Sequence, residues 1–183
     1  MPPIYEPSED SYLMSDVLKR KLSKLLKANP ELKFLEIGCG SGINLQTALS
    51  SGIKIENITG TDINVNAVKQ CRKLGFRCIK SNLFSNIKGK FDLIVFNPPY
   101  LPFDEKEPKN SRRETTGGKR GNEITIKFLK QAKKHLNNGG RIFVITSSLA
   151  RSINFNKLGY KAKELNNKKL FFETLFLWEC LKI

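Results

Sequence analysis

The sequence predicts an α/β domain with a mostly parallel sheet and helices on both of its faces. Short apolar runs alternate with helix-like stretches along most of the chain, which is typical of repeated strand–helix units. A glycine-rich turn follows the first apolar run, and a proline-rich turn follows the fourth. Because ligands of open α/β sheets bind beyond the carboxyl ends of the strands, we expect both turns to contribute to one site.

A helix is expected at the beginning of the chain, over residues 8–28. Ser8 can cap this helix, Glu9 and Asp10 stand at its positive end, and lysines crowd its far end. Pro30 ends it. Its apolar side comprises Leu13, Val17, Leu22, Leu25 and Leu26.

The central elements follow in regular order. Further helices are expected at 44–50, 64–74 and 123–136, and strands at 34–37, 57–62, 76–80, 91–96 and 141–146. The stretch 82–90 is too short for a full crossover helix, and 101–121 is the one long segment without expected structure. A loop of that length in a compact domain is usually functional or disordered, and its place directly after the proline-rich turn predicts a substrate-binding lid.

Two strands are expected at the end of the chain, at 160–165 and 170–181. The polar residues 166–169 form the expected turn between them. The stretch from Leu170 to Trp178 is apolar on both faces, so it should be an interior strand. The hairpin makes this last strand antiparallel, whereas the sheet of a dehydrogenase would continue in parallel.

The proline-rich turn is the most informative feature and comprises Asn97, Pro98, Pro99 and Tyr100. The side-chain carbonyl of Asn97 can accept a hydrogen bond, and the prolines leave their backbone carbonyls as outward acceptors. Tyr100 offers a flat face for stacking. Two acceptors and an aromatic ring recognise an NH2 group on an sp2 carbon, as in a carboxamide or adenine. The alternative is a strand that simply ends in a proline-stiffened turn.

The glycine-rich turn has the spacing E-x-G-x-G-x-G and comprises Glu36, Gly38, Gly40 and Gly42. Glycines let the backbone approach a ligand closely. Asp62 ends the next strand, where a carboxylate can accept hydrogen bonds from both ribose hydroxyls. The spacing differs from the G-x-G-x-x-G of pyrophosphate-binding turns, so a nucleoside with an amino-acid tail fits better than NAD. Either element alone would also be an ordinary strand–helix turn.

Length and composition agree with one small enzyme. The 183 residues are expected to form a single domain, 1–183, with an N-terminal helical segment at 1–30 and the lid at 101–121. The sequence has no apolar stretch that could span a membrane and no features of a secretion signal. The spacing of its four cysteines and its single histidine predict reduced thiols in a cytoplasmic protein, and no metal site.

The net charge of +15 allows two interpretations. Lysine and arginine neutralise phosphates, which favours a nucleic-acid partner, but the same charge is found on a solvated, lysine-rich surface. A basic group in the predicted lid lies next to the proposed site and comprises Lys106, Lys109, Arg112, Arg113, Lys119 and Arg120. Charge alone does not choose between a protein substrate and a nucleic-acid substrate.

These motifs resemble the class I methyltransferases that use S-adenosylmethionine, and within them the HemK-like N-methyltransferases. The segment from Tyr5 to Leu13, Y-E-P-S-E-D-S-Y-L, is similar to the start of the short archaeal and eukaryotic branch. That branch methylates the glutamine of the Gly-Gly-Gln motif in class 1 peptide chain release factors. The resemblance covers nearly the whole chain and implies a Rossmann-like sheet of seven strands, mostly parallel, with an antiparallel last strand.

The resemblance also implies roles for individual residues. S-adenosylmethionine would be the cofactor, bound by Ser11, Glu36, Gly38, Gly40, Asp62, Asn82, Leu83 and Asn97. The catalytic residues would be Asn97, Pro98 and Tyr100, which together with Pro99 would also bind the substrate. The Asn97 and Pro98 carbonyls would accept both N–H groups of the glutamine amide. Two positions depart from the family pattern: Asn82 replaces the usual acid, and the segment 115–123 lacks its aromatic residue.

Two alternatives and one partner stay open at this point. Adenine-N6 methylation of DNA or RNA uses the same Asn-Pro-Pro-Tyr motif, although no target-recognition domain is evident. A nucleoside-binding module without activity is the second alternative. The short branch resembles proteins that pair with a small zinc-binding activator subunit, for which strand 76–80 offers a docking face. The release factor is the favoured partner, and nucleic acid is not favoured.

Overall fold

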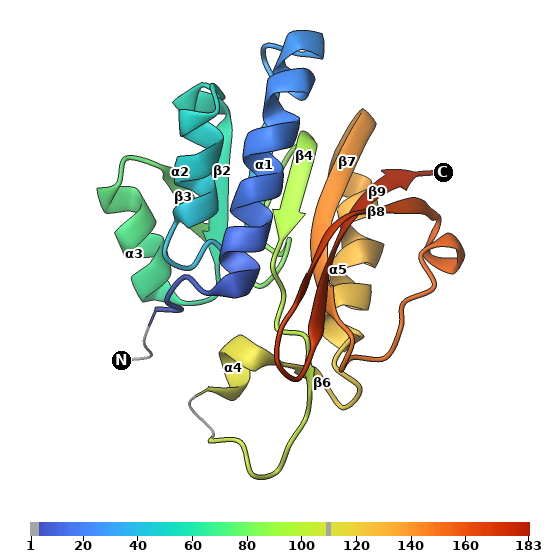
Figure 1. The fold of residues 1–183 in the computed structure, drawn as a ribbon. Helices are drawn as coiled ribbons and strands as arrows, with labels where there is room; N and C mark the ends of the chain where they lie inside the picture. The colour runs from blue at the N-terminus through green and yellow to red at the C-terminus, as the bar shows by residue number, and fades with distance from the viewer. Residues whose placement is uncertain (1–3, 109–110) are drawn as a thin grey trace.

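The computed structural model describes residues 4–108 and 111–183, so Lys109 of the basic group lies outside the described residues. A seven-stranded sheet forms its centre, in the order β3-β2-β1-β4-β7-β9-β8 (Figure 1). The strands are β1 (Phe34–Ile37), β2 (Ile58–Asp62), β3 (Arg77–Lys80), β4 (Phe91–Phe96), β7 (Leu136–Ser147), β8 (Tyr160–Lys169) and β9 (Thr174–Lys182). The main helices are α1 (Glu9–Ala28), α2 (Ile43–Ser50), α3 (Val65–Lys73) and α5 (Glu123–Ala132). The predicted α/β fold class is confirmed.

The last strand, β9, is the antiparallel member of this sheet. It lies between β7 and β8, and Trp178 at its centre pairs with Val144 on one side and Glu164 on the other. The remaining pairs, from β3 to β7, are parallel. The predicted interior position of the last strand is therefore confirmed, which explains why its sequence is apolar on both faces.

The register of the sheet brings three loops together. Ile37 at the end of β1 pairs with Thr61 of β2 on one side and with Phe96 of β4 on the other. The glycine-rich turn, Asp62 and Asn97 therefore follow neighbouring strands at the same level. All three lie at the carboxyl edge of the sheet, where open α/β folds bind their ligands.

Helices cover both faces of the sheet (Figure 1), and an apolar core holds them against each face. The first lies under α1, α2 and α3 and includes Leu18 and Leu93, whereas the second lies under α5 and includes Ile94 and Phe128. Successive residues of a strand point to opposite faces, so the neighbours Leu93 and Ile94 reach different cores. Burial on both faces accounts for the uninterrupted apolar runs of the central strands.

Helix α1 matches its predicted range but not its predicted cap. Leu13, Val17 and Leu22 are buried in the first core, as expected from the apolar stripe. Ser8 stands at the N-cap position, but its side chain makes no capping hydrogen bond, so that prediction is wrong. Asp10 in the first turn is buried, and its carboxylate bonds other segments of the protein. None of the described helices is long and apolar enough to span a membrane.

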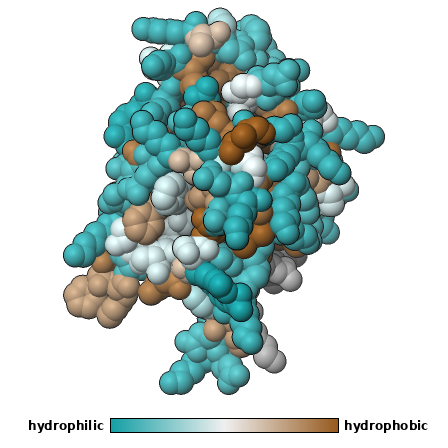
Figure 2. Space-filling model, turned by 90° about the vertical axis from the view of Figure 1, so that its right-hand side faces the viewer, coloured by the Kyte–Doolittle hydropathy of each residue, from teal (hydrophilic) through white to brown (hydrophobic). Residues whose placement is uncertain are grey.

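The turn before the last strand lies four residues later than predicted. β8 continues through Lys169, and the turn runs from Leu170 to Glu173, where the Leu170 N–H donates to the Glu173 carbonyl at 2.7 Å. The polar residues 166–169 fit β8 because it is an edge strand with an exposed side. The surface on the β8 and β9 side of the molecule is largely hydrophilic, with smaller apolar areas (Figure 2). Phe171 and Phe172 are consequently exposed at the tip of the hairpin.

The boundary between α5 and β7 also differs from the prediction. α5 ends at Ala132, one 3-10 turn follows, and β7 begins at Leu136 instead of at residue 141. The polar stretch 137–140, predicted as a helix stop, joins the strand through a bulge opposite Phe91. The Asn137 amide stabilises this extension because it donates to the Asp92 carboxylate at 2.7 Å.

The segment 101–121, predicted without structure, contains three short elements in its described residues. They are β5 (Leu101–Pro102), α4 (Arg112–Thr115) and β6 (Thr116–Gly118), with β5 paired to β6. The Glu107 carboxylate ties them together, since it accepts hydrogen bonds from the hydroxyls of Ser111, Thr115 and Thr116. The expectation of an unstructured loop is therefore wrong, because side-chain bonds within the segment replace a large apolar core.

Candidate active site

A pocket of about 730 Å³ opens at the carboxyl edge of the sheet. It is formed by the glycine-rich turn after β1, the end of β2, the turn after β3, the proline-rich turn after β4 and the N-terminal segment before α1. The predicted site residues that line it are Ser11, Glu36, Gly38, Gly40, Asp62, Asn82, Leu83, Asn97, Pro98 and Pro99. Sequence positions separated by almost ninety residues therefore share one cavity.

The glycine-rich turn adopts a backbone conformation that favours glycine. Gly38, Gly40 and Gly42 all have positive φ, between +48° and +88°. The turn is held by two contacts: the Gly40 N–H donates to the Asp62 carboxylate at 2.9 Å, and the Gly42 N–H donates to the Cys39 carbonyl at 2.7 Å. α2 begins directly after Gly42, so the turn delivers backbone rather than side chains to the pocket.

Glu36 presents a buried carboxylate to this pocket. Its Oε1 accepts a hydrogen bond from Asn44 at 2.8 Å, while its Oε2 has no hydrogen-bond partner among the described residues. Burial raises the pKa of Glu36 well above its ordinary value. A positively charged ligand group would satisfy the second oxygen and favour the ionised form. Sequence reasoning missed Asn44, whose polar side chain in the first turn of α2 was the available signal.

Asp62 is oriented by the backbone around it. It accepts hydrogen bonds from the N–H groups of Gly40 and Asn64, at 2.9 and 2.7 Å. Burial raises the pKa of Asp62, and the hydrogen bonds from these backbone N–H groups lower it by a smaller amount. A carboxylate has about four lone-pair positions, so acceptor capacity remains on the side that lines the pocket.

Asn97 carries a second buried acceptor without a partner. Its Oδ1 is inaccessible and makes no hydrogen bond with any residue the structure describes, and its side chain lines the pocket next to Pro98 and Pro99. Buried carbonyl oxygens are rarely left unpaired in folded proteins. An N–H donor from a ligand is the natural partner for this atom.

Tyr100 occupies a different position from its three neighbours in the motif. Within the described part of the chain it is not among the residues that line the pocket, and its ring packs against the first core. Its hydroxyl donates to the Asp10 carboxylate at 3.2 Å. Burial, followed by the charge of Asp10, raises the pKa of Tyr100. The structure thus places Tyr100 as a support beneath the proline-rich turn.

Asp10 joins the N-terminal segment to the proline-rich turn. Besides the Tyr100 hydroxyl, its carboxylate accepts hydrogen bonds from the Tyr5 hydroxyl at 2.9 Å and from the Ser11 N–H at 2.6 Å. Burial, together with the nearby Asp10 charge, raises the pKa of Tyr5. From the sequence alone, Asp10 is expected only to interact with the helix dipole of α1. The feature of the sequence that could have indicated its bridging role is its position between Tyr5 and Ser11 in the N-terminal motif.

The turn after β3 forms another rim of the pocket. Leu83 has a φ of +51° and is the one non-glycine residue in the described chain with positive φ. The Ser81 hydroxyl holds this conformation by donating to the Leu83 carbonyl at 2.8 Å. Asn82, adjacent to it, lines the pocket. Strain of this kind in a rim residue is typical of binding sites.

The predicted lid packs against the proline-rich turn through two glycines. A Cβ at Gly117 would stand 2.5 Å from the Pro99 carbonyl oxygen, and one at Gly121 would stand 2.5 Å from that of Tyr100. Only glycine permits this approach. The lid also contributes Glu114 to the pocket, a residue that sequence reasoning missed. Burial, and then the nearby charge of Asp62, raise the pKa of Glu114.

The sheet order, with antiparallel β9 between β7 and β8, and the pocket beyond β1, β2 and β4 define the fold of a class I methyltransferase. A family model described as the methyltransferase small domain matches residues 14–171. The chain belongs to this family and, within it, to the HemK-like N-methyltransferases.

Three relatives make this similarity specific. A Methanocaldococcus jannaschii protein with the provisional name protein N5-glutamine methyltransferase is 37% identical, over 96% of this chain and 90% of its own length. The Mus musculus methyltransferase HEMK2 is 31% identical, over 78% of this chain and 71% of its own. In the E. cuniculi Mtq2–Trm112 complex, responsible for methylating the translation termination factor eRF1, one chain matches with a TM-score of 0.71, 25% identity and full coverage of both chains.

Proposed function

We propose that this protein transfers a methyl group from S-adenosylmethionine to the side-chain amide nitrogen of the glutamine in the Gly-Gly-Gln motif of a class 1 peptide chain release factor. The observation that carries the proposal is the buried Oδ1 of Asn97, which has no hydrogen-bond partner among the described residues and belongs to a residue that lines the pocket. Two of the relatives named above support the same substrate class: the Methanocaldococcus jannaschii protein through its glutamine methyltransferase name, and the Mtq2–Trm112 complex through its methylation of a termination factor.

The residues of the pocket fit S-adenosylmethionine. Oε2 of Glu36 is a buried acceptor that suits the ammonium of the amino-acid tail, and the fixed carboxylate of Asp62 suits the ribose hydroxyls. Asn82 and Leu83 would border the adenine. Bound in this way, S-adenosylmethionine supplies a methyl group on a positively charged sulfur.

Catalysis by the chain consists mainly of positioning. The lone pair of an amide nitrogen is delocalised, so glutamine attacks poorly unless it is held in place. Asn97 Oδ1 and the Pro98 carbonyl would each accept one N–H of the amide and fix its nitrogen in line with the methyl carbon, which contributes up to several kcal/mol. The same two oxygens stabilise the positive charge that grows on the nitrogen. The released proton can leave to water.

A small zinc-binding activator is the partner we propose for the edge of the sheet at β3. Among the described strands, β3 pairs with β2 alone, so its other edge presents free backbone groups. Ile55 and Leu74, both 42% exposed, are the nearby apolar side chains, since a Cβ at Gly75 beside Leu74 would touch Ile55. The neighbour solved as an Mtq2–Trm112 complex supports a partner subunit.

Methyl transfer to alternative substrates tests the proposal. The purified chain, with and without the activator, is given labelled S-adenosylmethionine and a release factor, its Gly-Gly-Gln→Gly-Gly-Ala variant, DNA or RNA. We expect label on the wild-type factor and none on the alanine variant. Label on nucleic acid alone would replace the proposal with adenine-N6 methylation.

A further inference from the structure

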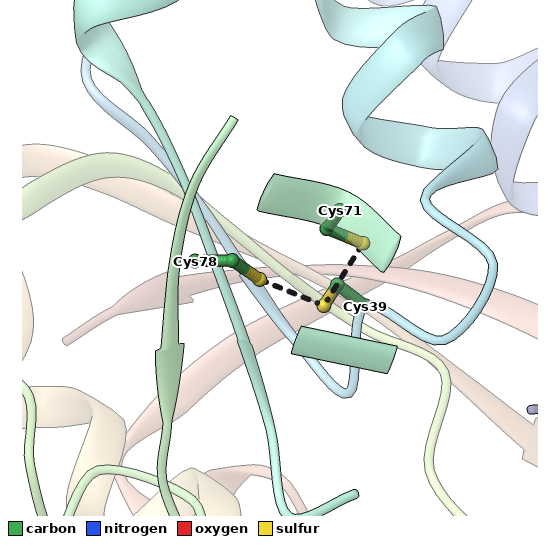
Figure 3. A group of neighbouring side chains, drawn as sticks. All are labelled: Cys39, Cys71 and Cys78. Atoms are coloured by element: carbon green, nitrogen blue, oxygen red, sulfur yellow. Dashed lines mark hydrogen bonds between the residues drawn. The ribbon is translucent and has the colours of Figure 1, made fainter. Parts of the chain in front are cut away.

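Three of the four cysteines converge below the cofactor pocket, and their sulfur atoms face one another (Figure 3). Cys39 lies in the glycine-rich turn, Cys71 in the last turn of α3 and Cys78 on β3. Each is at most 3% exposed. The proposed methyl transfer uses none of these thiols, so their convergence needs a separate account.

The distances between the sulfur atoms suit a metal ion. Sγ of Cys39 lies 3.1 Å from Sγ of Cys78 and 3.5 Å from Sγ of Cys71, and all three atoms lie within 4.8 Å of one another. An ion bonded to three sulfurs at about 2.3 Å in one plane needs them about 4.0 Å apart. Side-chain adjustments of less than about one ångström would therefore close the triangle around an ion.

The surrounding backbone leaves room for the three sulfurs. Gly60 of β2 passes between Cys39 and Cys78, and a Cβ at this position would stand 3.0 Å from the Cys78 sulfur and 3.2 Å from the Cys39 Cβ. A Cβ at Gly42 would likewise stand 3.2 Å from the Cys71 sulfur, which puts that sulfur beside the N-terminus of α2.

We propose that Cys39, Cys71 and Cys78 form a binding site for one monovalent copper ion, held by three thiolates. All-sulfur ligand sets select soft ions, mainly Cu(I) and Zn(II). Zinc in structural sites almost always takes four ligands. The described residues that converge here offer three, and each of these residues is at most 3% exposed, which leaves little room for water as a fourth ligand. Monovalent copper accepts three-coordination by sulfur.

Binding is a ligand exchange without a redox step. Three S–H bonds break, three S–Cu bonds form, and three protons leave to the solvent. The bound ion would link the glycine-rich turn to α3 and to the edge strand β3, whose cysteines follow Cys39 by 32 and 39 residues (Figure 3). Because Cys39 also lines the cofactor pocket, copper should stiffen the turn that receives the nucleoside.

Copper loading of variants in which one cysteine is replaced by alanine tests this site. The measurement does not depend on methyl transfer. The reduced chain is titrated without oxygen with Cu(I) held by a competing chelator, and copper per chain is measured after desalting. Cys180→Ala is the matched control, because Cys180 is equally buried but lies in the second core. We expect a ratio near one for wild type and Cys180→Ala, and near zero for Cys78→Ala and Cys71→Ala.

X-ray absorption of copper-loaded wild-type protein supplies a measurement that does not depend on whether the variants fold. Three sulfur neighbours and no nitrogen or oxygen neighbour are expected. The proposal would be overturned if wild-type protein bound no copper, or if it bound one zinc ion per chain in preference to copper. It would also be overturned if Cys78→Ala bound as much copper as wild type, or if Cys180→Ala lost its copper.

Discussion

Asn97 is the residue on which the proposed chemistry depends. Asn97→Asp nearly conserves the shape of the side chain, so the fold and the affinity for S-adenosylmethionine should be retained. The new carboxyl group either takes a proton, which turns an acceptor into a donor, or places a second negative charge near Asp62. We expect kcat to fall on the order of 100-fold or more. Wild-type kcat in this variant would contradict the role of Asn97.

Asp10 is expected to control the stability of the N-terminal segment. In Asp10→Asn, one of the two carboxylate oxygens is replaced by an NH2 group that faces the donors of Tyr5 and Tyr100. The free energy of unfolding should fall by about 1–3 kcal/mol. The KM for S-adenosylmethionine should rise with it, because the N-terminal segment that contributes Tyr5 and Ser11 to the pocket is then held less firmly. Thermal unfolding and steady-state kinetics measure both effects, with exposed Asp16→Asn as the control that changes neither.

Glu36 should make the cofactor-free protein less stable as the pH rises. Its pKa is higher in the folded chain than its ordinary value of 4.5, so the folded state holds the proton more tightly and loses stability above pH 4.5. Glu36→Gln removes this loss. At pH 7 we expect the variant to be more stable than wild type by at least about 1 kcal/mol, with weaker cofactor binding.

Thermal unfolding across pH tests this prediction for Glu36. The difference between wild type and Glu36→Gln should shrink as the pH falls toward 4.5. The exposed substitution Glu105→Gln should follow wild type at every pH. A constant difference between wild type and Glu36→Gln would show that the carboxyl group does not titrate as described.

Most residues that line the pocket could be predicted from the sequence. The side-chain contacts that hold the pocket segments in place could not. Glu36, Asp62 and Asn97 lie at or just after the carboxyl ends of three neighbouring strands, and parallel strands bring these ends together at one edge of the sheet. The pairing of Asp10 with Tyr100 joins positions ninety residues apart through side chains alone. No local pattern encodes such a contact, which explains why Tyr100 was expected as a stacking plate rather than as a support.

At the scale of elements, the β8–β9 hairpin shows why turn positions are hard to predict. Four polar residues suggested a turn, but an exposed edge strand accepts them equally well. The actual turn carries Phe171 and Phe172, which are 92% and 83% exposed and stack edge to face. It is anchored beside the site, since the Ser147 hydroxyl donates to the Glu173 carboxylate and Lys168 forms an ion pair with Glu9.

The position of this hairpin predicts a contact with the protein substrate, given the proposed function. A release factor that inserts its glutamine next to Asn97 must pass over the same edge of the sheet. The double change Phe171→Ser and Phe172→Ser should raise KM for the intact factor on the order of tenfold, because exposed aromatic anchors carry much of interface affinity. The kcat for a short Gly-Gly-Gln peptide should be unchanged.

A matched control for the hairpin is available at the opposite edge of the sheet. Ile183 is 77% exposed and follows the far end of β9, so Ile183→Ser removes exposed apolar surface away from the site. Ile183→Ser should change neither the KM for the intact factor nor the kcat for the short peptide. Equal KM values for wild type and the double variant on the intact factor would rule out a role for the hairpin.

At the scale of the whole molecule, the sequence predicted the sheet well because its order follows from a few strong signals. Strands with apolar runs must be covered on both faces, and a doubly buried final strand must lie inside the sheet. The lid was less predictable, because Glu107 and the glycine contacts at Pro99 organise it instead of an apolar pattern. The cysteine cluster was not predictable from spacing, since the fold brings Cys39 next to Cys71 and Cys78, which follow it by 32 and 39 residues.

Fragmentation mass spectrometry of the release factor, after reaction with the wild-type chain and with Asn97→Asp, locates the methyl group that the protein transfers. We expect one added methyl group on the side-chain amide of the Gly-Gly-Gln glutamine, and an unmodified peptide from the reaction with Asn97→Asp. A methyl group on any other residue, or an unmodified glutamine from wild-type protein that methylates DNA or RNA, would contradict the proposed function.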